Sequence, residues 1–207
     1  MGTGAEALVR ADPYADSEPQ ARTNVRILNA AARLFYRRGI RAVSVDEVAA
    51  EASVTKVTVY KHYRAKDELL AACLHALDER FFSWFVHEVE ASTDDPHERL
   101  LAVYDVLDRW FHRRDFRGCA FINATVELAN PEHVARTAVL AHKTRCRDYF
   151  RELAQACGLP DAEGISDQWM LLTEGATITA LVEGDLGAAR KARVGAAAIL
   201  RSVAAAA

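Results

Sequence analysis

Six polar and basic side chains stand close together in the stretch between Val54 and Tyr63. They are Thr55, Lys56, Thr58, Tyr60, Lys61 and His62. Lysine ammonium groups bind phosphate as point charges, and hydroxyl, phenol and imidazole groups can hydrogen-bond the edges of nucleic-acid bases. This set could contact nucleic acid, with the lysines on phosphates and Thr58 and Tyr60 nearest the base edges, or it could be the solvated polar face of an ordinary pair of surface helices.

Two short helices joined by a turn are predicted to position these side chains. Ser44 is a favourable helix N-cap, and Glu47 stands three residues later, ahead of the apolar pair Val48 and Ala49. This spacing is typical of a capping box, in which the two side chains bond each other's backbone N–H groups. The first helix should therefore begin directly after Ser44.

The second helix is predicted to follow a turn at Ser53 and Val54, where the helical pattern is interrupted. Thr55 offers a side-chain cap for a helix of barely two turns. So short a helix is not stable alone in water and depends on tertiary packing. Val54, Val59 and Tyr63 would supply this packing, which leaves the polar side chains facing outward.

Residues 54–69, VTKVTVYKHYRAKDEL, resemble the signature of the TetR family of bacterial repressors. There, Val-Ser precedes Lys-Gly-Thr-Leu-Tyr-x-His-Phe-x-x-Lys-Glu-x-Leu. The resemblance implies a helix-turn-helix in residues 44–63 whose second helix enters the DNA major groove. The chain departs from the pattern at Ser53, where Gly is common, and at Val57, where Gly or Ala is preferred. We expect the docking on DNA to differ at these two positions.

The resemblance also assigns Lys66, at the start of a long helix, to a DNA phosphate. The full set of expected DNA contacts is Ser44, Thr55, Lys56, Thr58, Tyr60, Lys61, His62 and Lys66. By the same resemblance, the chain is a repressor that binds a palindromic operator as a homodimer, pairs through its last two helices and is released by a small-molecule effector. No cofactor, metal or catalytic residue is expected.

The charge distribution agrees with a DNA-binding head on an acidic body. The whole chain has a net charge of −3, but residues 21–66 hold ten Arg and Lys against three Asp and Glu, a net charge of +7. Residues 1–20 have a net charge of −3, so the remainder carries −7. Phosphate attraction supplies most of the non-specific affinity for DNA, which this basic segment could provide.

Helical spacing without any competing strand pattern predicts an all-α fold. Residues 1–20 should form a disordered tail, residues 21–81 the helix-turn-helix DNA-binding domain, and residues 82–207 a helical ligand-binding and dimerisation domain. One supporting helix should run from Asn24 to Arg38 and end at Gly39. Another should begin directly after Asn130-Pro131 and reach about Cys157. The last two should span about residues 162–183 and run from about residue 186 to the end.

Aromatic and polar residues of the second domain could line a cavity for a small ligand. The candidates are Trp84, Trp110, Phe111, Cys119, Phe121, Asn123, His142, Trp169 and Thr173. Core packing is the alternative interpretation of each aromatic residue, since most buried aromatics only fill space.

Other classes of function stay open at this point. Cys119 or His142 could serve a small helical enzyme as nucleophile or base, although no base and orienting partner is recognisable. His142 and Cys146, four residues apart, could bind a transition metal, and Cys119 could sense oxidants.

The four cysteines lack any Cys-x-x-Cys spacing, and the chain has no long apolar run or secretory leader, so we expect a reducing, cytoplasmic address.

Overall fold

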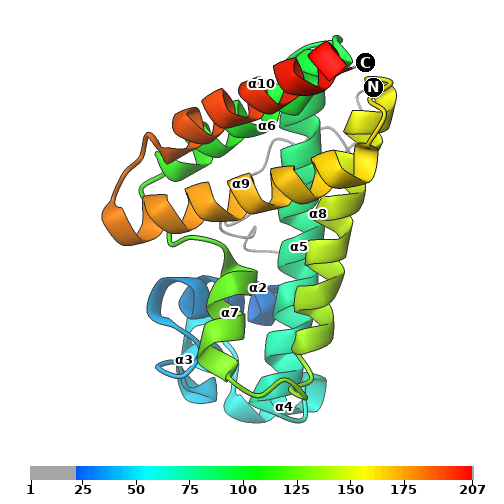
Figure 1. Cartoon of the computed structure of the whole chain (residues 1–207). Coiled ribbons are helices and arrows are strands. Elements are labelled where there is room, and N and C mark those ends of the chain that lie inside the picture. Colours follow the sequence, from blue (N-terminus) through cyan, green and yellow to red (C-terminus); the bar gives the residue numbers. More distant parts are fainter. Residues whose placement is uncertain (1–21, 207) are drawn as a thin grey trace, which may run out of the picture. The chain divides into compact units, whose positions relative to one another are not determined.

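The computed structural model describes residues 22–206, and all regular secondary structure in this part of the chain is α-helical (Figure 1). The predicted all-α fold is confirmed. The predicted disordered tail lies outside the described residues. The helices are α2 (Thr23–Arg38), α3 (Val45–Glu51), α4 (Lys56–His62), α5 (Lys66–Glu90), α6 (Pro96–Phe111), α7 (Ala120–Leu128), α8 (Arg136–Ala156), α9 (Ala162–Glu183) and α10 (Ala188–Ala206).

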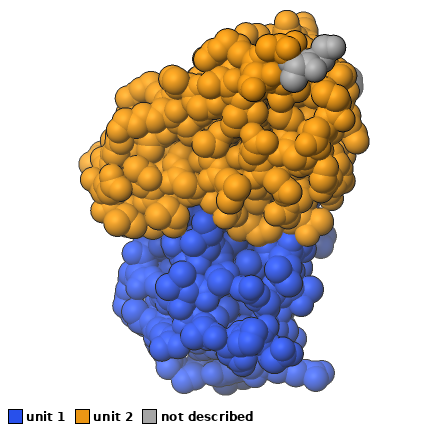
Figure 2. All heavy atoms as spheres, viewed as in Figure 1, with its two compact units in different colours: residues 1–84, 119–142 blue, residues 85–118, 143–207 orange. Residues whose placement is uncertain are grey.

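Contacts divide the chain into two compact units (Figure 2). Unit 1 comprises the described residues up to Trp84 together with Cys119–His142, and unit 2 comprises Phe85–Gly118 and the residues from Lys143 onward. These units are defined by contacts between residues, whereas the predicted domains were defined by DNA binding and ligand binding. The predicted domain boundary between residues 81 and 82 therefore stays a prediction. Among residues 22–206, no helix is both long and apolar enough to cross a membrane.

The core of unit 1 holds α2, α3 and α4 against the start of α5. Ile27 of α2, Val48 of α3, Val59 of α4 and Leu69 of α5 are almost completely buried in one apolar cluster. Helix α2 ends at Arg38, as predicted, and Gly39 follows with a positive φ of 88°. Because each short helix contributes to this shared core, tertiary packing fixes α3 and α4 in place.

Unit 2 contains the packed helices α6, α9 and α10. Trp169 of α9 is fully buried there, and its indole N–H donates to the Leu100 carbonyl of α6 at 2.9 Å. Small residues of α10, including Ala189 and Ala196, are also fully buried. These small side chains allow α10 to approach its two neighbours closely.

Helix α8 begins later than the sequence predicted. Instead of starting after Pro131, it starts at Arg136. Helix α7 ends at Leu128, and the following Ala129 adopts a left-handed φ of 53°. The Asn130 side chain accepts a hydrogen bond from the Glu132 N–H at 3.0 Å, and His133 Nδ1 accepts one from the Ala135 N–H at 3.1 Å. These local bonds satisfy the backbone without a helix, so they explain the delayed start.

Candidate nucleic-acid interface

A complete capping box begins α3 after Ser44, as predicted. Ser44 Oγ accepts a hydrogen bond from the Glu47 N–H at 3.2 Å, and Glu47 Oε2 accepts one from the Ser44 N–H at 2.8 Å. The Ser44 hydroxyl also donates to Glu47 Oε2 at 2.8 Å. The Ser44 side chain, expected among the DNA contacts, is thus engaged in holding the helix start.

The turn after α3 has the hydrogen bonds of a Schellman motif. The Val54 N–H donates to Ala49 O at 2.9 Å, and the Ser53 N–H donates to Ala50 O at 3.1 Å. Ser53 adopts a φ of 53°, which costs a non-glycine residue about 1–2 kcal/mol. The Arg26 guanidinium donates to the Ser53 carbonyl at 3.2 Å, so α2 helps to stabilise a turn that lacks the usual glycine.

Helix α4 presents most of its surface outward. Thr55 Oγ1 accepts a hydrogen bond from the Thr58 N–H at 3.1 Å, which confirms the predicted cap. Of the seven residues of α4, Val59 is the one that is buried. The Thr55 and Thr58 hydroxyls bond each other at 2.8 Å, and Thr58 is partly buried.

Val57 and Tyr60 are the exposed large hydrophobic side chains of α4. The Val57 side chain is 64% exposed, and Tyr60, one turn later on the same face, is 42% exposed. Lys56, Lys61 and His62 are exposed as well. Val57 was missing from the predicted contacts, although its spacing from Tyr60 and Lys61 would have placed it with them.

The three acidic residues of α3 each pair with a basic side chain. Arg33 pairs with Glu51, Arg38 with Glu47 at 2.7 Å, and Lys56 Nζ with Asp46 Oδ2 at 2.8 Å. The hydrogen bond and charge of Asp46 raise the pKa of Lys56. Exposed pairs of this kind are worth only about 0–1 kcal/mol. A DNA phosphate could therefore replace Asp46 as the partner of Lys56 at small cost.

Lys66 holds the segment between α2 and α3. Its Nζ donates to the Ile40 carbonyl at 2.6 Å and lies 5.8 Å from the centre of the Phe35 ring. From the other side, Glu127 Oε2 of α7 accepts a hydrogen bond from the Arg41 N–H at 3.1 Å. The peptide group that joins Ile40 to Arg41 is thus held at both its carbonyl and its amide.

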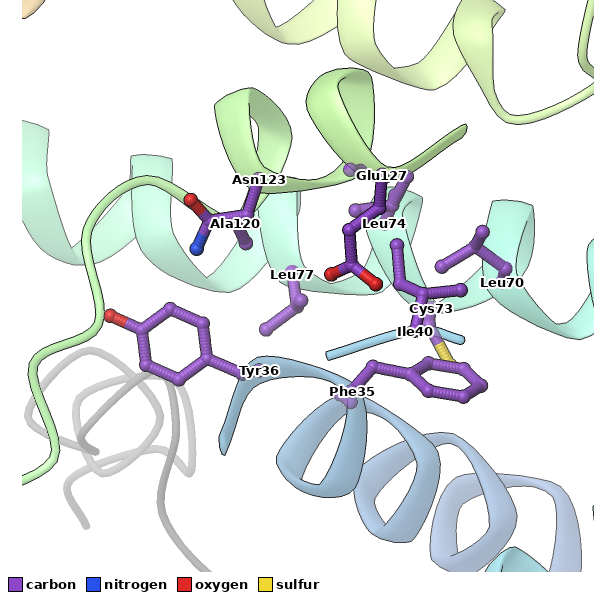
Figure 3. A pocket seen from close by; sticks show the side chains of 12 residues that line it. Phe35, Tyr36, Ile40, Leu70, Cys73, Leu74, Leu77, Ala120, Asn123 and Glu127 are labelled. Carbon is purple, nitrogen blue, oxygen red and sulfur yellow. The ribbon is translucent and has the colours of Figure 1, made fainter. Parts of the chain in front are cut away.

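Figure 3 shows Glu127 of α7 pointing into a small pocket that is also lined by α2, Ile40 and α5. A Cβ on Gly39 would lie 3.2 Å from Glu127 Oε2, so glycine gives this carboxylate room. Asn123 lines the same pocket. The remaining lining residues are Ala32, Phe35, Tyr36, Leu70, Cys73, Leu74, Leu77, Ala120 and Ala124.

The predicted ligand-pocket residues divide between the two units. Trp84, Cys119, Phe121, Asn123 and His142 belong to unit 1, whereas Trp110, Phe111, Trp169 and Thr173 belong to unit 2. In unit 1, the buried His142 ring stacks on Phe121 with 3.7 Å between ring centres, and its Nδ1 bonds Asp78 Oδ1 at 2.6 Å.

In unit 2, Trp110 and Phe111 pack around Phe116, and Trp169 lies beside Tyr104. Neither unit by itself gathers all nine predicted residues into one pocket.

The described residues give little support to a reactive thiol or a metal site. None of the four cysteines forms a disulfide, and burial raises the pKa of the Cys73 thiol and, to about 11, that of Cys157. Cys119 is partly buried at the N-terminus of α7. Across the described residues, no three His, Cys, Asp or Glu side chains converge in a group that could hold a metal ion.

Known proteins resemble this chain in sequence and in fold. The family model described as "Bacterial regulatory proteins, tetR family" matches residues 27–73. The transcriptional regulator TtgR of Pseudomonas putida is 37% identical over 186 residues, which cover 80% of this chain and 89% of TtgR. The transcriptional activator FasR of Mycolicibacterium smegmatis is 28% identical over 121 residues, and the match spans 58% of this chain but only 54% of FasR.

Among solved structures, a TetR-family transcriptional regulator from Streptomyces coelicolor superposes with a TM-score of 0.77 at 31% identity. The superposition covers 87% of this chain and 95% of that one. The likeness therefore extends well beyond the helix-turn-helix.

Proposed function

This chain belongs to the TetR family of DNA-binding bacterial regulators, and from that premise we propose that it is a transcriptional repressor that binds a palindromic operator as a homodimer. The observation that carries the proposal is the outward face of α4, where Val57, Tyr60 and Lys61 are exposed within a segment of net charge +7. One such helix reads few base pairs. Two copies related by a twofold axis read two half-sites about one helical turn apart or more.

An exposed apolar face on α9 supports the homodimer. Leu171 and Val182 are 73% and 74% exposed, and Ile178 lies between them at helical spacing. Apart from Gly175 itself, its two chain neighbours and the nearby backbone of α9, no described heavy atom lies within 4 Å of the position that a Cβ on Gly175 would take. The opposite side of α9 is already packed against α6 and α10. A second copy of the chain would cover this exposed face, as the family resemblance implies.

Two buried hydroxyl groups in unit 2 support an effector site. The Tyr104 hydroxyl and Thr173 Oγ1 are both buried close to each other, but they do not form a hydrogen bond of normal geometry with each other or with any other group. Burial raises the pKa of Tyr104, and the neighbouring Thr173 hydroxyl offsets part of the rise. An unsatisfied buried polar group costs about 1–3 kcal/mol. We propose that an apolar effector with a polar group binds here and satisfies these hydroxyls, which changes the affinity for the operator.

The enzyme and metal-sensor alternatives receive less support. His142 Nδ1 bonds Asp78 in a buried pair, but among the described residues no three His, Cys, Asp or Glu side chains converge in a group that could hold a metal ion. The matched relatives are named as transcriptional regulators. These observations favour regulation over catalysis.

The test is selection of duplex DNA from a random pool by the full-length chain, followed by affinity measurements on the selected sequence. We expect Tyr60→Ala to weaken specific binding roughly ten-fold or more, because one good base contact is worth about 1–3 kcal/mol in each half-site. Val126→Ala, which changes an exposed residue of α7, is the matched control. A Tyr60→Ala variant that bound as tightly as the unmodified chain would overturn the role given to α4.

A further inference from the structure

Val57 is an exposed apolar side chain in the middle of an otherwise polar surface. It is 64% exposed in the first turn of α4, where Val59 alone packs inward. Tyr60 and Lys61 follow it at three and four residues, so the three side chains share one face of the helix. Val57 therefore lies where α4 would meet a bound macromolecule.

Neither the fold nor the helix requires valine at this position. Its side chain adds nothing to the apolar cluster of unit 1, which is built from other residues. A β-branched residue is also a weaker helix former than Ala or Lys, so helix propensity does not favour it. The folded chain alone therefore gives this valine no role, whereas an apolar contact in the complex with DNA would.

The bases in the DNA major groove offer one distinctive apolar group. Each base pair presents hydrogen-bond donors and acceptors there, and thymine alone adds a C5-methyl group. The hydroxyl, phenol and ammonium groups around Val57 suit the polar edges and the phosphates. The two methyl groups of valine suit the thymine methyl.

We propose that Val57 is a specificity-determining residue that contacts the C5-methyl group of one thymine in each operator half-site. The inference rests on the proposed binding of DNA through α4. Removing one buried methyl group should weaken binding roughly four-fold in each half-site, and roughly fifteen-fold when both half-sites are changed.

The experiment uses full-length protein and the duplex selected as described above. Each thymidine is replaced in turn, in both half-sites, by deoxyuridine, which lacks only the methyl group. Affinities are measured for the unmodified chain, for Val57→Ala and for the control Val126→Ala, whose side chain is 75% exposed on α7. Because Val57 is exposed, the alanine variant should fold normally, and circular dichroism checks this.

We expect one thymine position, the same in both half-sites, at which deoxyuridine lowers the DNA affinity of the unmodified chain and of Val126→Ala roughly fifteen-fold. At this position, deoxyuridine should change the DNA affinity of Val57→Ala less than two-fold. When a cytosine–guanine pair replaces the thymine–adenine pair at that position, 5-methylcytosine in place of the cytosine should recover part of the affinity of the unmodified chain and of Val126→Ala, but not that of Val57→Ala. If specific binding is found but every thymine responds equally in Val57→Ala and the unmodified chain, the thymine contact is wrong and the proposed function stands. If no specific duplex is selected, both are wrong.

Discussion

At the scale of single residues, the ionisation of Glu47 should control the stability of the helix-turn-helix. Hydrogen bonds from the Ser44 backbone and hydroxyl, together with Arg38, lower the pKa of Glu47 to about 2 from an ordinary value of 4.5. A depressed pKa in the folded state means that the stabilisation is complete above pH of about 4.5 and disappears as the pH falls toward about 2. Acidification should therefore weaken the start of α3.

The corresponding measurement compares urea unfolding of the unmodified chain and Glu47→Gln across this pH range. We expect the unmodified chain to be more stable at neutral pH, and the difference to shrink steadily between pH of about 4.5 and about 2. Glu132→Gln, at an exposed glutamate before α8, controls for the general effect of acid on the chain. A difference that stays constant down to the lowest pH would contradict the role of the ionised carboxylate.

Several residue-level features could be predicted from local sequence, because local chemistry determines them. The capping box at Ser44 and Glu47 and the Thr55 cap depend on groups three residues apart, and both are confirmed. Val57 stands out in the sequence as a departure from the family pattern but is left out of the expected DNA contacts, because those contacts are assigned to polar and basic side chains. Ser53 adopts a left-handed φ, and a hydrogen bond from the distant Arg26 to its carbonyl stabilises this conformation. The residues next to Ser53 in the sequence do not reveal this bond.

At the scale of elements, α7 should stabilise the segment that connects α2 and α3. Glu127 accepts a hydrogen bond from the Arg41 N–H, while Lys66 donates to the adjacent Ile40 carbonyl. A hydrogen bond to a charged group contributes about 1.5–3 kcal/mol. Loss of the carboxylate should therefore release the Arg41 amide and loosen the path from α2 to α3.

Hydrogen exchange measured on Glu127→Ala and Glu127→Gln tests this connection. We expect the Arg41 amide to exchange about ten-fold faster or more in the alanine variant, with a smaller change in the glutamine variant, which keeps an acceptor oxygen. Val126→Ala, one residue earlier on α7 and exposed, should leave the exchange unchanged. Equal protection of Arg41 in all four proteins would show that Glu127 does not hold the segment.

The connection between α7 and this segment could not be predicted from the sequence. Arg41 and Glu127 are 86 positions apart, and no periodic pattern links them. Asn130-Pro131 marked a helix boundary correctly, but the side-chain bonds of Asn130 and His133 delay the start of α8 to Arg136. Helical periodicity predicts that an element exists far better than it predicts where the element begins or what it contacts.

At the scale of the whole molecule, the exposed face of α9 should hold two copies of the chain together. Leu171→Glu places a charge on the proposed interface, where burial of an unpaired carboxylate is strongly unfavourable. We expect sedimentation velocity to show dimers for the unmodified chain and monomers for this variant at micromolar concentration. Leu140→Glu, at an exposed leucine of α8, is the control and should remain dimeric. A Leu171→Glu variant that stayed dimeric would place the interface elsewhere.

The most direct test of DNA recognition by α4 is the salt dependence of operator affinity for the unmodified chain and Lys61→Ala. Each phosphate contact adds close to one unit to the slope of log affinity against log salt, so a dimer that loses two lysines should lose about two units. We expect the variant to bind more weakly at low salt and with this shallower slope. An unchanged affinity and slope would contradict the placement of α4 against the DNA backbone.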